Sequence, residues 1–573
     1  MPTLEFKGKQ YIYSHHHSVP FRELLINEKK SFPAHGKKPS LDDNLIIHGD
    51  NLHALKALMP HYAGKIKCIY IDPPYNTGNE GWCYNDNVNS PLMKDWISKN
   101  ANPVDKEDMQ RHDKWLCMMY PRLKLLHELL SDDGVIFVSI DDNELYNLRC
   151  VLDEVFSDQN WVGTIVWKNA TDNNPTNISV EHEYVLCFSK KKDSLVNIWK
   201  SAKSDIKNKL IEIGTQLVKE HKEQSLLQKA YTDWFRVNKP YLSTLDRYKY
   251  IDNGGVYTGS QSVHNPGREG YRYDVIHPTT KKACKQPLMG YRFPKETMEK
   301  LIEEGKILFG EDEDKIIELK VYAFQYEDKL PSLISLDGRL GAYEFKSILH
   351  DSKKFDNPKP SQFIKQILAY VLGKDDLILD SFAGSGTTAH AVLDLNKEDG
   401  GNRKFILVEM EDYADPITAE RVRRVIKGVP TAKDEKLKAG LGGSFTFCEL
   451  GKEISIEKII TGESLPDYGA LAQYVFYTAT GKSLEKQTTQ RPDYFVGETD
   501  LYEVYLIYKP DIAFLRCNDS ALNDTKLQAI AARNSKKEKL VFATAKYMGQ
   551  KELSSQNITF CQLPYAIHKV VGG

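Results

Sequence analysis

The feature that most constrains the fold is a glycine-rich turn between an apolar run and a helical pattern, DLILDSFAGSGTTAHAVL (376–393). Glycine accepts a tight turn and lets backbone amides approach a ligand at a helix N-terminus, where the helix dipole is positive. Gly384, Gly386 and Ala389 fit the dinucleotide fingerprint, and Glu409 ends the next apolar run about 20 residues on, where an acid can bind ribose hydroxyls. The pattern therefore favours a cofactor cradle over a plain strand-to-helix turn, without separating nicotinamide from S-adenosylmethionine.

Short apolar runs alternate with helical patterns elsewhere in the chain. Residues 44–62 combine an apolar run, a Gly-Asp turn and a helix, and 65–71 and 134–140 read as buried strands. A helix over 106–130 is expected to bend at Pro121. A parallel sheet covered by helices on both faces produces this alternation. We therefore predict an α/β fold with a doubly wound, largely parallel, Rossmann-like sheet.

The chain of 573 residues is too long for one hydrophobic core. The α/β pattern gives way after about Lys190 to a lysine-rich helical stretch and then to tyrosine- and glycine-rich segments, and it returns near residue 348. The predicted division is an N-terminal arm (1–40), a first half of the core (41–195), an inserted domain (196–347), a second half of the core (348–428) and a C-terminal α/β domain (429–573).

Composition limits the partners and the compartment. A net charge of -2 argues against a chain that coats nucleic acid over its whole surface, so any such contact must be local. Without a long apolar run or a secretory leader, we expect a cytoplasmic protein and no membrane contact. The nine cysteines form no Cys-x-x-Cys pair, so reduced thiols are expected. His15, His16 and His17 lack a spaced partner, so we expect surface or capping histidines and no metal site.

A second motif, DPPY (72–75), directly follows the apolar run KIKCIYI. Prolines remove amide donors and fix φ, so the chain must leave the sheet at Asp72 with its backbone carbonyls free. A planar base can then donate one amine hydrogen to Asp72 and the other to a proline carbonyl, while Tyr75 stacks on its face. This grip draws the amine toward the tetrahedral geometry in which its lone pair attacks a methyl group. The alternative is a Pro-Pro turn capped by Asp72.

DPPY and FAGSGT together resemble the amino-group DNA methyltransferases, and the order of the two motifs resembles the permuted beta class. The segments GDNLHALKALMPHYAGKIKCIYIDPPYNTGN, GVIFVSIDDNE, HEYVLCFSK and NPKPSQFIKQIL are similar to modification (Mod) subunits of Type III restriction-modification systems. The resemblance implies a permuted methyltransferase sheet, S-adenosylmethionine as cofactor, and double-stranded DNA with a flipped adenine as substrate. It also implies a homodimer and a Res helicase-nuclease subunit, with the C-terminal domain as a candidate interface.

The resemblance assigns roles to individual residues. The catalytic tetrad is Asp72, Pro73, Pro74 and Tyr75. The implied cofactor-binding residues are Asp50, Lys359, Pro360, Asp380, Phe382, Gly384, Gly386, Thr387 and Glu409. Glu409 is assigned to the ribose and Asp50 to the neighbourhood of the adenine, although Asp50 also suits a simple strand-end turn. His182 and Glu183 are interpreted as residues of the fold.

The inserted domain holds the candidate for reading DNA sequence. The segment 267–295 has seven basic residues against two acidic ones, interleaved with four aromatic residues. Such a segment can contact phosphate or guanine, and a solvated basic face is an equal alternative. The candidate DNA-binding residues are Arg268, Arg272, Lys281, Lys282, Lys285 and Arg292. The polar segment 76–87 is expected to form a mobile loop that closes over the flipped base.

Other functions remain open from the sequence. One is a stand-alone DNA methyltransferase without a restriction partner. Another is a noncatalytic specificity subunit for a nuclease, although the chain itself shows no convincing nuclease motif. A nicotinamide oxidoreductase would explain the glycine loop but leaves DPPY unexplained.

Overall fold

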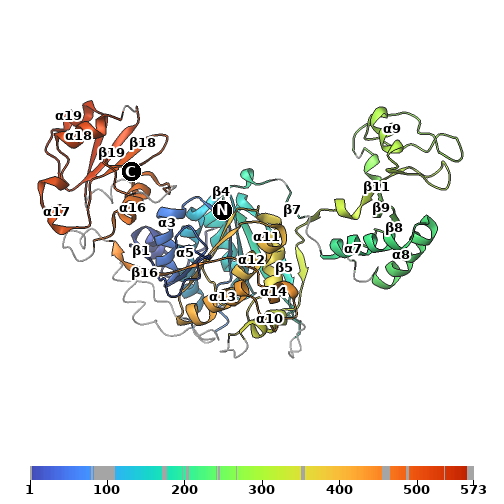
Figure 1. Ribbon diagram of the computed structural model, residues 1–573, viewed down its shortest axis with the longest axis horizontal. Helices are drawn as coiled ribbons and strands as arrows, with labels where there is room; N and C mark the ends of the chain where they lie inside the picture. Colours follow the sequence, from blue (N-terminus) through green and yellow to red (C-terminus); the bar gives the residue numbers. More distant parts are fainter. Residues whose placement is uncertain are drawn as a thin grey trace. The chain divides into compact units, whose positions relative to one another are not determined.

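The computed structural model describes residues 3–78, 82, 110–170, 177–196, 198–201, 205–239, 242, 245–265, 267–349, 355–454, 465–484, 489–533 and 536–563. The chain divides into two compact units (Figure 1): Ile198–Leu330 forms one, and Met1–Asn197 with Pro331–Gly573 forms the other. No helix within the described ranges is both long and apolar enough to cross a membrane.

The larger unit is built on a ten-stranded sheet in the order β1-β16-β2-β15-β14-β3-β4-β6-β5-β13. Six neighbouring strands of this sheet are parallel: β16 (Thr446–Ile454), β2 (Leu45–His48), β15 (Lys404–Glu409), β14 (Leu377–Asp380), β3 (Ile66–Ile71) and β4 (Leu130–Ile140). The others are β1 (Phe21–Ile26), antiparallel to β16; β6 (His182–Ser189), antiparallel to β4 and to β5 (Trp161–Lys168); and β13 (Leu333–Ser335), parallel to β5. The predicted doubly wound, largely parallel sheet is confirmed.

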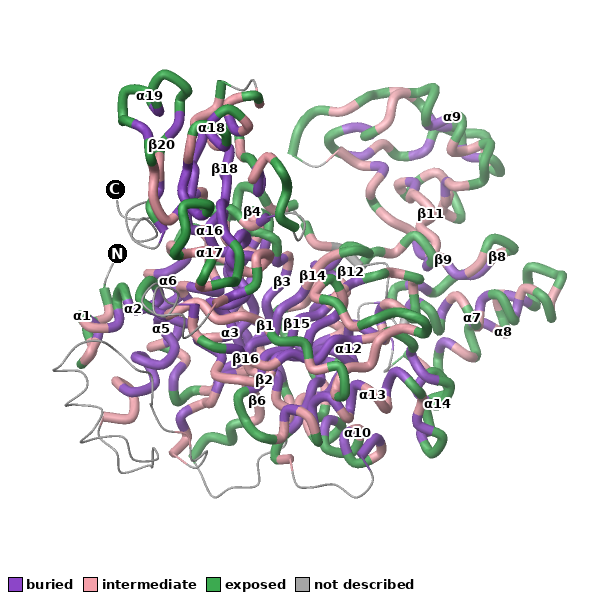
Figure 2. Tube along the Cα trace, turned by 60° about the vertical axis from the view of Figure 1, so that its left-hand side comes forward, coloured by how far each residue is buried: buried purple, intermediate pink, exposed green. Residues whose placement is uncertain are grey.

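Helices cover the sheet because its strands are apolar on both faces. Alternate strand residues such as Ile47, Ile69 and Ile136 join one core cluster with α3 (Asn51–Tyr62), α5 (Arg111–Leu129) and α6 (Leu145–Phe156). The intervening residues, including Ile46 and Ile378, are equally buried, as the purple strands of Figure 2 show. The further helices of this core are α1 (Lys9–Ile12), α2 (His15–Ser18), α10 (Arg339–Leu349), α11 (Ser361–Val371), α12 (Thr387–Asp399), α13 (Glu420–Lys427) and α14 (Glu435–Ala439).

A second sheet follows the core toward the C-terminus. It has the order β17-β18-β19-β20 and comprises β17 (Phe495–Glu498), β18 (Tyr502–Leu506), β19 (Glu538–Ala543) and β20 (Ile558–Gln562), with helices α16 (Tyr468–Thr480), α17 (Ile512–Arg516), α18 (Asp524–Ala531) and α19 (Gln550–Ser555). The main sheet differs from the predicted division here. It includes β1 from the expected N-terminal arm and β16 from the expected C-terminal domain, because β16 pairs with both β1 and β2.

The smaller unit has its own elements and cores. Its helices and strands are β7 (Lys200–Ser201), α7 (Asp205–Glu220), α8 (Gln224–Asn238), β8 (Tyr250–Asp252), β9 (Gly255–Ser260), α9 (Lys295–Glu303), β10 (Ile307–Leu308), β11 (Glu318–Tyr322) and β12 (Asp328–Lys329). One apolar cluster joins α7 and α8 to β8 and β9, and another surrounds α9. This unit ends before residue 347, the predicted limit of the insertion, because β13 pairs with β5 of the main sheet.

Candidate active site

Four acidic residues follow four neighbouring strands of the main sheet. Asp50 lies just after β2, Glu409 ends β15, Asp380 ends β14 and Asp72 follows β3. These strands are adjacent and parallel, so their carboxyl ends meet at one edge of the sheet. Ligand sites of open α/β sheets lie at this edge. The fold thus brings the tetrad and the glycine loop together from distant parts of the sequence.

The glycine loop leads into helix α12 and contains two glycines with left-handed backbone angles. Gly384 has a φ of 51° and Gly386 a φ of 79°, in the region that favours glycine. A Cβ added at Gly386 would lie 3.2 Å from the Thr418 carbonyl oxygen. The Gly384 amide donates to the Glu409 carboxylate at 2.8 Å, which links the loop to the end of β15. The predicted strand, turn and helix are therefore present with the acid beside the turn.

Asp380 and Glu409 are buried acids at this loop. Burial raises the pKa of each carboxyl group to about 7. Asp380 accepts hydrogen bonds from the Phe382 amide at 3.1 Å and the Thr388 hydroxyl at 2.5 Å, so both of its oxygens serve the turn itself. Glu409 likewise uses both oxygens, because it also accepts from the Glu411 amide at 3.0 Å, so both acids brace the loop. Phe382 is only partly buried.

The DPPY tetrad meets a lysine and a glutamate from other elements. The Lys359 ammonium lies 3.2 Å from Asp72 Oδ2 and 3.1 Å from Glu183 Oε2, and it donates to the Tyr75 hydroxyl at 3.0 Å. The Tyr75 hydroxyl donates in turn to Glu183 Oε2 at 2.9 Å. We call Asp72, Tyr75, Glu183 and Lys359 the acceptor cluster. Lys359 therefore lies with the tetrad, whereas the sequence had placed it beside the cofactor.

Charges in the acceptor cluster are interdependent. Burial raises the pKa of Asp72 above its ordinary value, Lys359 opposes this rise and Glu183 adds to it. Burial alone would lower the pKa of Lys359, but the two carboxylates raise it above its ordinary value. Burial and the same carboxylates also raise the pKa of the Tyr75 phenol. Lys359 is therefore held as an ammonium ion and Tyr75 as a hydrogen-bond donor.

The carbonyls of the two prolines differ, contrary to the expectation that both remain free. The buried Trp115 indole, on α5, donates to the Pro74 carbonyl at 2.7 Å. No hydrogen bond reaches the Pro73 carbonyl from the described part of the chain. Asp72 Oδ1 is buried and also lacks a partner among the described residues. The free acceptors at the end of β3 are thus Asp72 Oδ1 and the Pro73 carbonyl.

Glu183, which the sequence predicts to be a residue of the fold, contacts Tyr75 and Lys359 in this cluster. It lies on β6, and its second oxygen accepts from the Asn169 amide at 2.7 Å. β6 is separated from β3 by β4, so only the strand order reveals that Glu183 reaches Tyr75. The one signal in the sequence was an acid at the start of an otherwise apolar strand.

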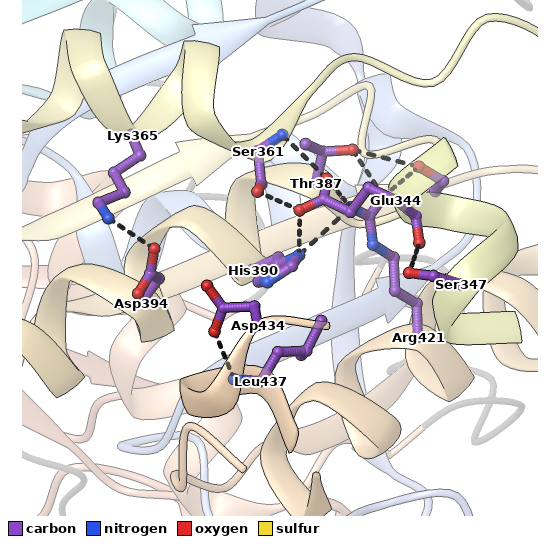
Figure 3. Close-up of polar contacts among 11 residues, drawn as sticks. Glu344, Ser347, Ser361, Lys365, Thr387, His390, Asp394, Arg421, Asp434 and Leu437 are labelled. Atoms are coloured by element: carbon purple, nitrogen blue, oxygen red, sulfur yellow. Dashed lines mark hydrogen bonds and ion pairs between the residues drawn. The ribbon is translucent and has the colours of Figure 1, made fainter. Parts of the chain in front are cut away.

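A buried polar network joins the glycine loop to the segment that carries Lys359 and Pro360 (Figure 3). Glu344 on α10 accepts from the Ser361 amide at 3.0 Å and pairs with Arg421 at 3.0 Å. Arg421 also donates to the Thr387 hydroxyl at 2.8 Å. Thr387 therefore serves this network, and Pro360 precedes the first residue of α11. Neither has a described contact that assigns it to a ligand.

Asp50 caps helix α3. Its carboxylate accepts from the His53 amide at 3.1 Å and lies 3.5 Å from the Arg122 guanidinium. Although burial opposes the charged form, the hydrogen bonds from His53 and the charge of Arg122 hold the pKa of Asp50 well below its usual range. Asp50 lies at the same edge of the sheet as Glu409, and its carboxylate remains partly exposed.

The segment after Tyr75 is anchored at its first residue. Asn76 adopts a φ of 63°, and its amide donates to the buried Glu144, which also lies 2.6 Å from His112 Nδ1. The expected closing loop, 76–87, lies outside the described residues except for 76–78 and 82.

The candidate DNA-binding residues all lie on the smaller unit and are exposed. Lys282 pairs with Glu313 at 2.7 Å, and Arg272 donates to the Leu288 carbonyl at 2.7 Å. The interleaved aromatic residues are divided, since Tyr291 belongs to the core around α9 whereas Tyr271 is 51% exposed. The segment therefore combines a local core with a basic surface.

Two of the three adjacent histidines are buried, contrary to the expectation of surface residues. Burial and positive neighbours, including His17 and Lys56, lower the pKa of His16 to about 3. Ligand atoms of His16, His17 and Glu128 lie within 4.8 Å of one another, a spacing that could hold a metal ion. The nearby ammonium groups of Lys56 and Lys124 oppose a cation there.

Comparison with known proteins identifies the class to which this sheet and site belong. The family model described as DNA methylase matches residues 66–420, which include the tetrad, the glycine loop and Glu409. The chain belongs to this family.

Individual relatives show which proteins of known description the chain is similar to. The chain is 48% identical over 407 residues to the Type III restriction-modification enzyme EcoP15I Mod subunit of Escherichia coli, covering 69% of this chain and 62% of the relative. It is 32% identical over 450 residues to the StyLTI Mod subunit of Salmonella typhimurium, covering 74% and 62%. It is 29% identical over 513 residues to the EcoPI Mod subunit of Escherichia phage P1, covering 79% and 73%. The matches thus span less than two thirds of the first two relatives.

Proposed function

We propose that this chain is a site-specific DNA methyltransferase that transfers a methyl group from S-adenosylmethionine to the exocyclic N6 amine of a flipped adenine, as the modification subunit of a Type III restriction-modification system. The observation that carries the proposal is the meeting of the DPPY tetrad and the glycine loop at the ends of the adjacent strands β3 and β14. Family membership and the similarity to Mod subunits support it. A nicotinamide oxidoreductase would leave the tetrad without a role.

The residues at the glycine loop fit S-adenosylmethionine. Gly384 and Gly386 both have positive φ, and glycine there lets the loop backbone approach a ligand closely. The Glu409 carboxylate suits ribose hydroxyls, and Phe382 offers an apolar surface. When bound, this cofactor would supply an electrophilic methyl group, and the carbon–sulfur bond that breaks would leave the sulfur as a neutral thioether. Gly384, Gly386, Phe382 and Glu409 are the residues proposed to hold it.

On the acceptor side, the free oxygens at the end of β3 match the two hydrogens of an amine. Asp72 Oδ1 accepts one and the Pro73 carbonyl accepts the other, while the Tyr75 ring stacks on the base. As the new carbon–nitrogen bond forms, positive charge develops on the amine, and the Asp72 carboxylate stabilises it. The amine then releases one proton to solvent.

In this proposal, other parts of the chain read the DNA sequence and contact partner subunits. The smaller unit contacts the target duplex through its basic surface, and the C-terminal sheet contributes to a homodimer or to contact with a Res helicase-nuclease subunit. With DNA as the substrate, the enzyme acts in the cytoplasm, as expected from the sequence. A stand-alone methyltransferase remains the alternative if no Res subunit copurifies.

Methyl transfer to DNA tests the proposal directly. The full chain is incubated with labelled S-adenosylmethionine and plasmid DNA that lacks methylated bases, and the DNA is digested to nucleosides. We expect labelled N6-methyladenine, and a loss of about 100-fold or more in Asp72→Asn, because the amide cannot stabilise the developing charge. Asp153→Asn on α6, where Asp153 pairs with Arg149, is the matched control. Methylcytosine alone, or an unaffected Asp72→Asn, would contradict the assignment.

A further inference from the structure

We propose that Lys359 is a positioning residue of the methyl-acceptor site. Together with Glu183 it fixes one oxygen of the Asp72 carboxylate, so that Oδ1 is left to receive the amine of the target base. The inference rests on the proposed function and deepens it, because it moves Lys359 from the cofactor to the acceptor and adds Glu183 to the site.

The Lys359 ammonium contacts all three other members of the cluster. It donates to the Tyr75 hydroxyl at 3.0 Å and forms ion pairs with Asp72 Oδ2 at 3.2 Å and Glu183 Oε2 at 3.1 Å. The Lys359 side chain is only 10% exposed. The Lys359 ammonium is therefore directed at the acceptor cluster.

The second observation concerns the free oxygen of Asp72, Oδ1. It is buried without a partner in the described part of the chain, and a buried acceptor without a donor is destabilising. A donor from a bound ligand would remove that cost. Because Lys359 engages Oδ2, the amine can reach Oδ1 without displacing the lysine.

The charge of Lys359 has a second effect on Asp72. Asp72 faces Glu183 and Tyr75 in the cluster, Tyr70 from its own strand and Asp380 from β14, and none of these groups is cationic. Without the ammonium, the neighbouring carboxylates favour protonation of Asp72. A protonated Asp72 loses the negative charge that stabilises the amine.

The surrounding structure holds Lys359 in place. The Ser361 amide, two residues on, donates to Glu344, and a Cβ at Gly341 on α10 would lie 1.8 Å from the Pro358 carbonyl oxygen. The Lys359 ammonium also lies 4.8 Å from the centre of the Tyr75 ring. The backbone on both sides of Lys359 is thus fixed by α10.

The test compares Lys359→Met and Lys359→Arg in the full chain with Lys365→Met as the matched control. Lys365 lies on α11 and also pairs with two carboxylates, those of Asp394 and Glu398. Cofactor affinity is measured by calorimetry with S-adenosylmethionine, and methyl transfer to unmethylated plasmid DNA is measured as a function of pH.

For Lys359→Met we expect cofactor affinity within about threefold of the wild type, a fall in kcat of about 100-fold, and an acid limb of the kcat/KM profile moved to higher pH by about one unit. Lys359→Arg should restore the acid limb in part. Lys365→Met should change none of these three quantities. A lost cofactor affinity with normal kcat, or an unmoved acid limb, would overturn the inference.

A second measurement separates this inference from the proposed function, because it needs no activity. Thermal unfolding of Lys359→Met should begin at a lower temperature than that of the wild type. Adding Asp72→Asn should recover at least half of the loss, since it removes the carboxylate that the lysine neutralises. No recovery would contradict the pairing, whereas wild-type protein that transfers no methyl group to adenine would contradict the proposed function alone.

Discussion

The Tyr75 hydroxyl donates to Glu183 Oε2 at 2.9 Å, which fixes the orientation of the aromatic ring at the end of β3. The partner is supplied by β6, on the far side of β4 from β3. A ring held in this way can offer its face to a base without first losing the freedom of its own side chain.

Substitutions at Tyr75 should separate the contribution of the aromatic ring from that of its hydroxyl. Tyr75→Phe keeps the stacking surface and loses the bond to Glu183, so we expect kcat/KM for methyl transfer within about tenfold of the wild type. Tyr75→Ala removes the stacking surface, which is worth about 1–3 kcal/mol per base, and should lower kcat/KM by up to about 100-fold. Equal effects of the two substitutions would exclude stacking as the main role of Tyr75.

Gly386→Val should weaken binding of S-adenosylmethionine, because the added side chain meets the Thr418 backbone and opposes a φ of 79°. Gly400→Val is the matched control at the other end of α12. Gly400 has a φ of 66°, but a Cβ there would meet nothing within 4 Å. Calorimetry should show a loss of affinity of about tenfold or more for Gly386→Val alone. Wild-type affinity in that variant would refute the proposed cradle.

The stability of the core should depend on pH through Glu409. Burial raises its pKa from 4.5 to about 7, so the folded state binds a proton more tightly than the unfolded state. Its contribution to the free energy of unfolding is therefore full below about pH 4.5 and is lost as the pH rises toward 7, by up to about 1.4 kcal/mol per pH unit. Glu409→Gln should reduce this dependence in urea unfolding between pH 5 and 8, while Asp380, whose pKa is also raised to about 7, keeps its own share. Glu435→Gln on α14, where the side chain is 82% exposed, is the matched control and should leave the dependence unchanged.

The basic surface of the smaller unit can be tested by salt dependence. If Arg268 contacts phosphate, Arg268→Ala should reduce the slope of the logarithm of affinity against the logarithm of salt concentration by about 1. Lys282→Ala should have a smaller effect, because the Lys282 ammonium already pairs with Glu313. Fluorescence anisotropy with a labelled duplex measures both. Identical slopes for Arg268→Ala and the wild type would place the DNA contact elsewhere.

Local sequence patterns could predict the central part of the fold and of the site. An apolar strand, a turn and a helix are contiguous in the chain, so the glycine loop and the DPPY motif could be found without coordinates. The pairing of Glu183 with Tyr75 depends on the order of β3, β4 and β6, which no local pattern encodes. The bond from Trp115 to the Pro74 carbonyl likewise depends on how α5 packs against the sheet.

The limits of the domains were harder to predict for a related reason. β13 has three residues, and its membership of the main sheet depends on pairing with β5. β16 follows the predicted core, but it fills the position between β1 and β2. Strands of this kind, at the edge of the sheet or one strand in from it, are defined by their neighbours in space, and their own sequences carry little signal.

The smaller unit begins and ends with strands that pair with each other, since β7 near its start is antiparallel to β12 near its end. The chain therefore enters and leaves this unit at two points that lie side by side, and we refer to the unit as a cassette. Under the proposed function, such a cassette could be exchanged between related enzymes by recombination. A lineage could then acquire a new target sequence in one event, while the catalytic machinery is inherited unchanged.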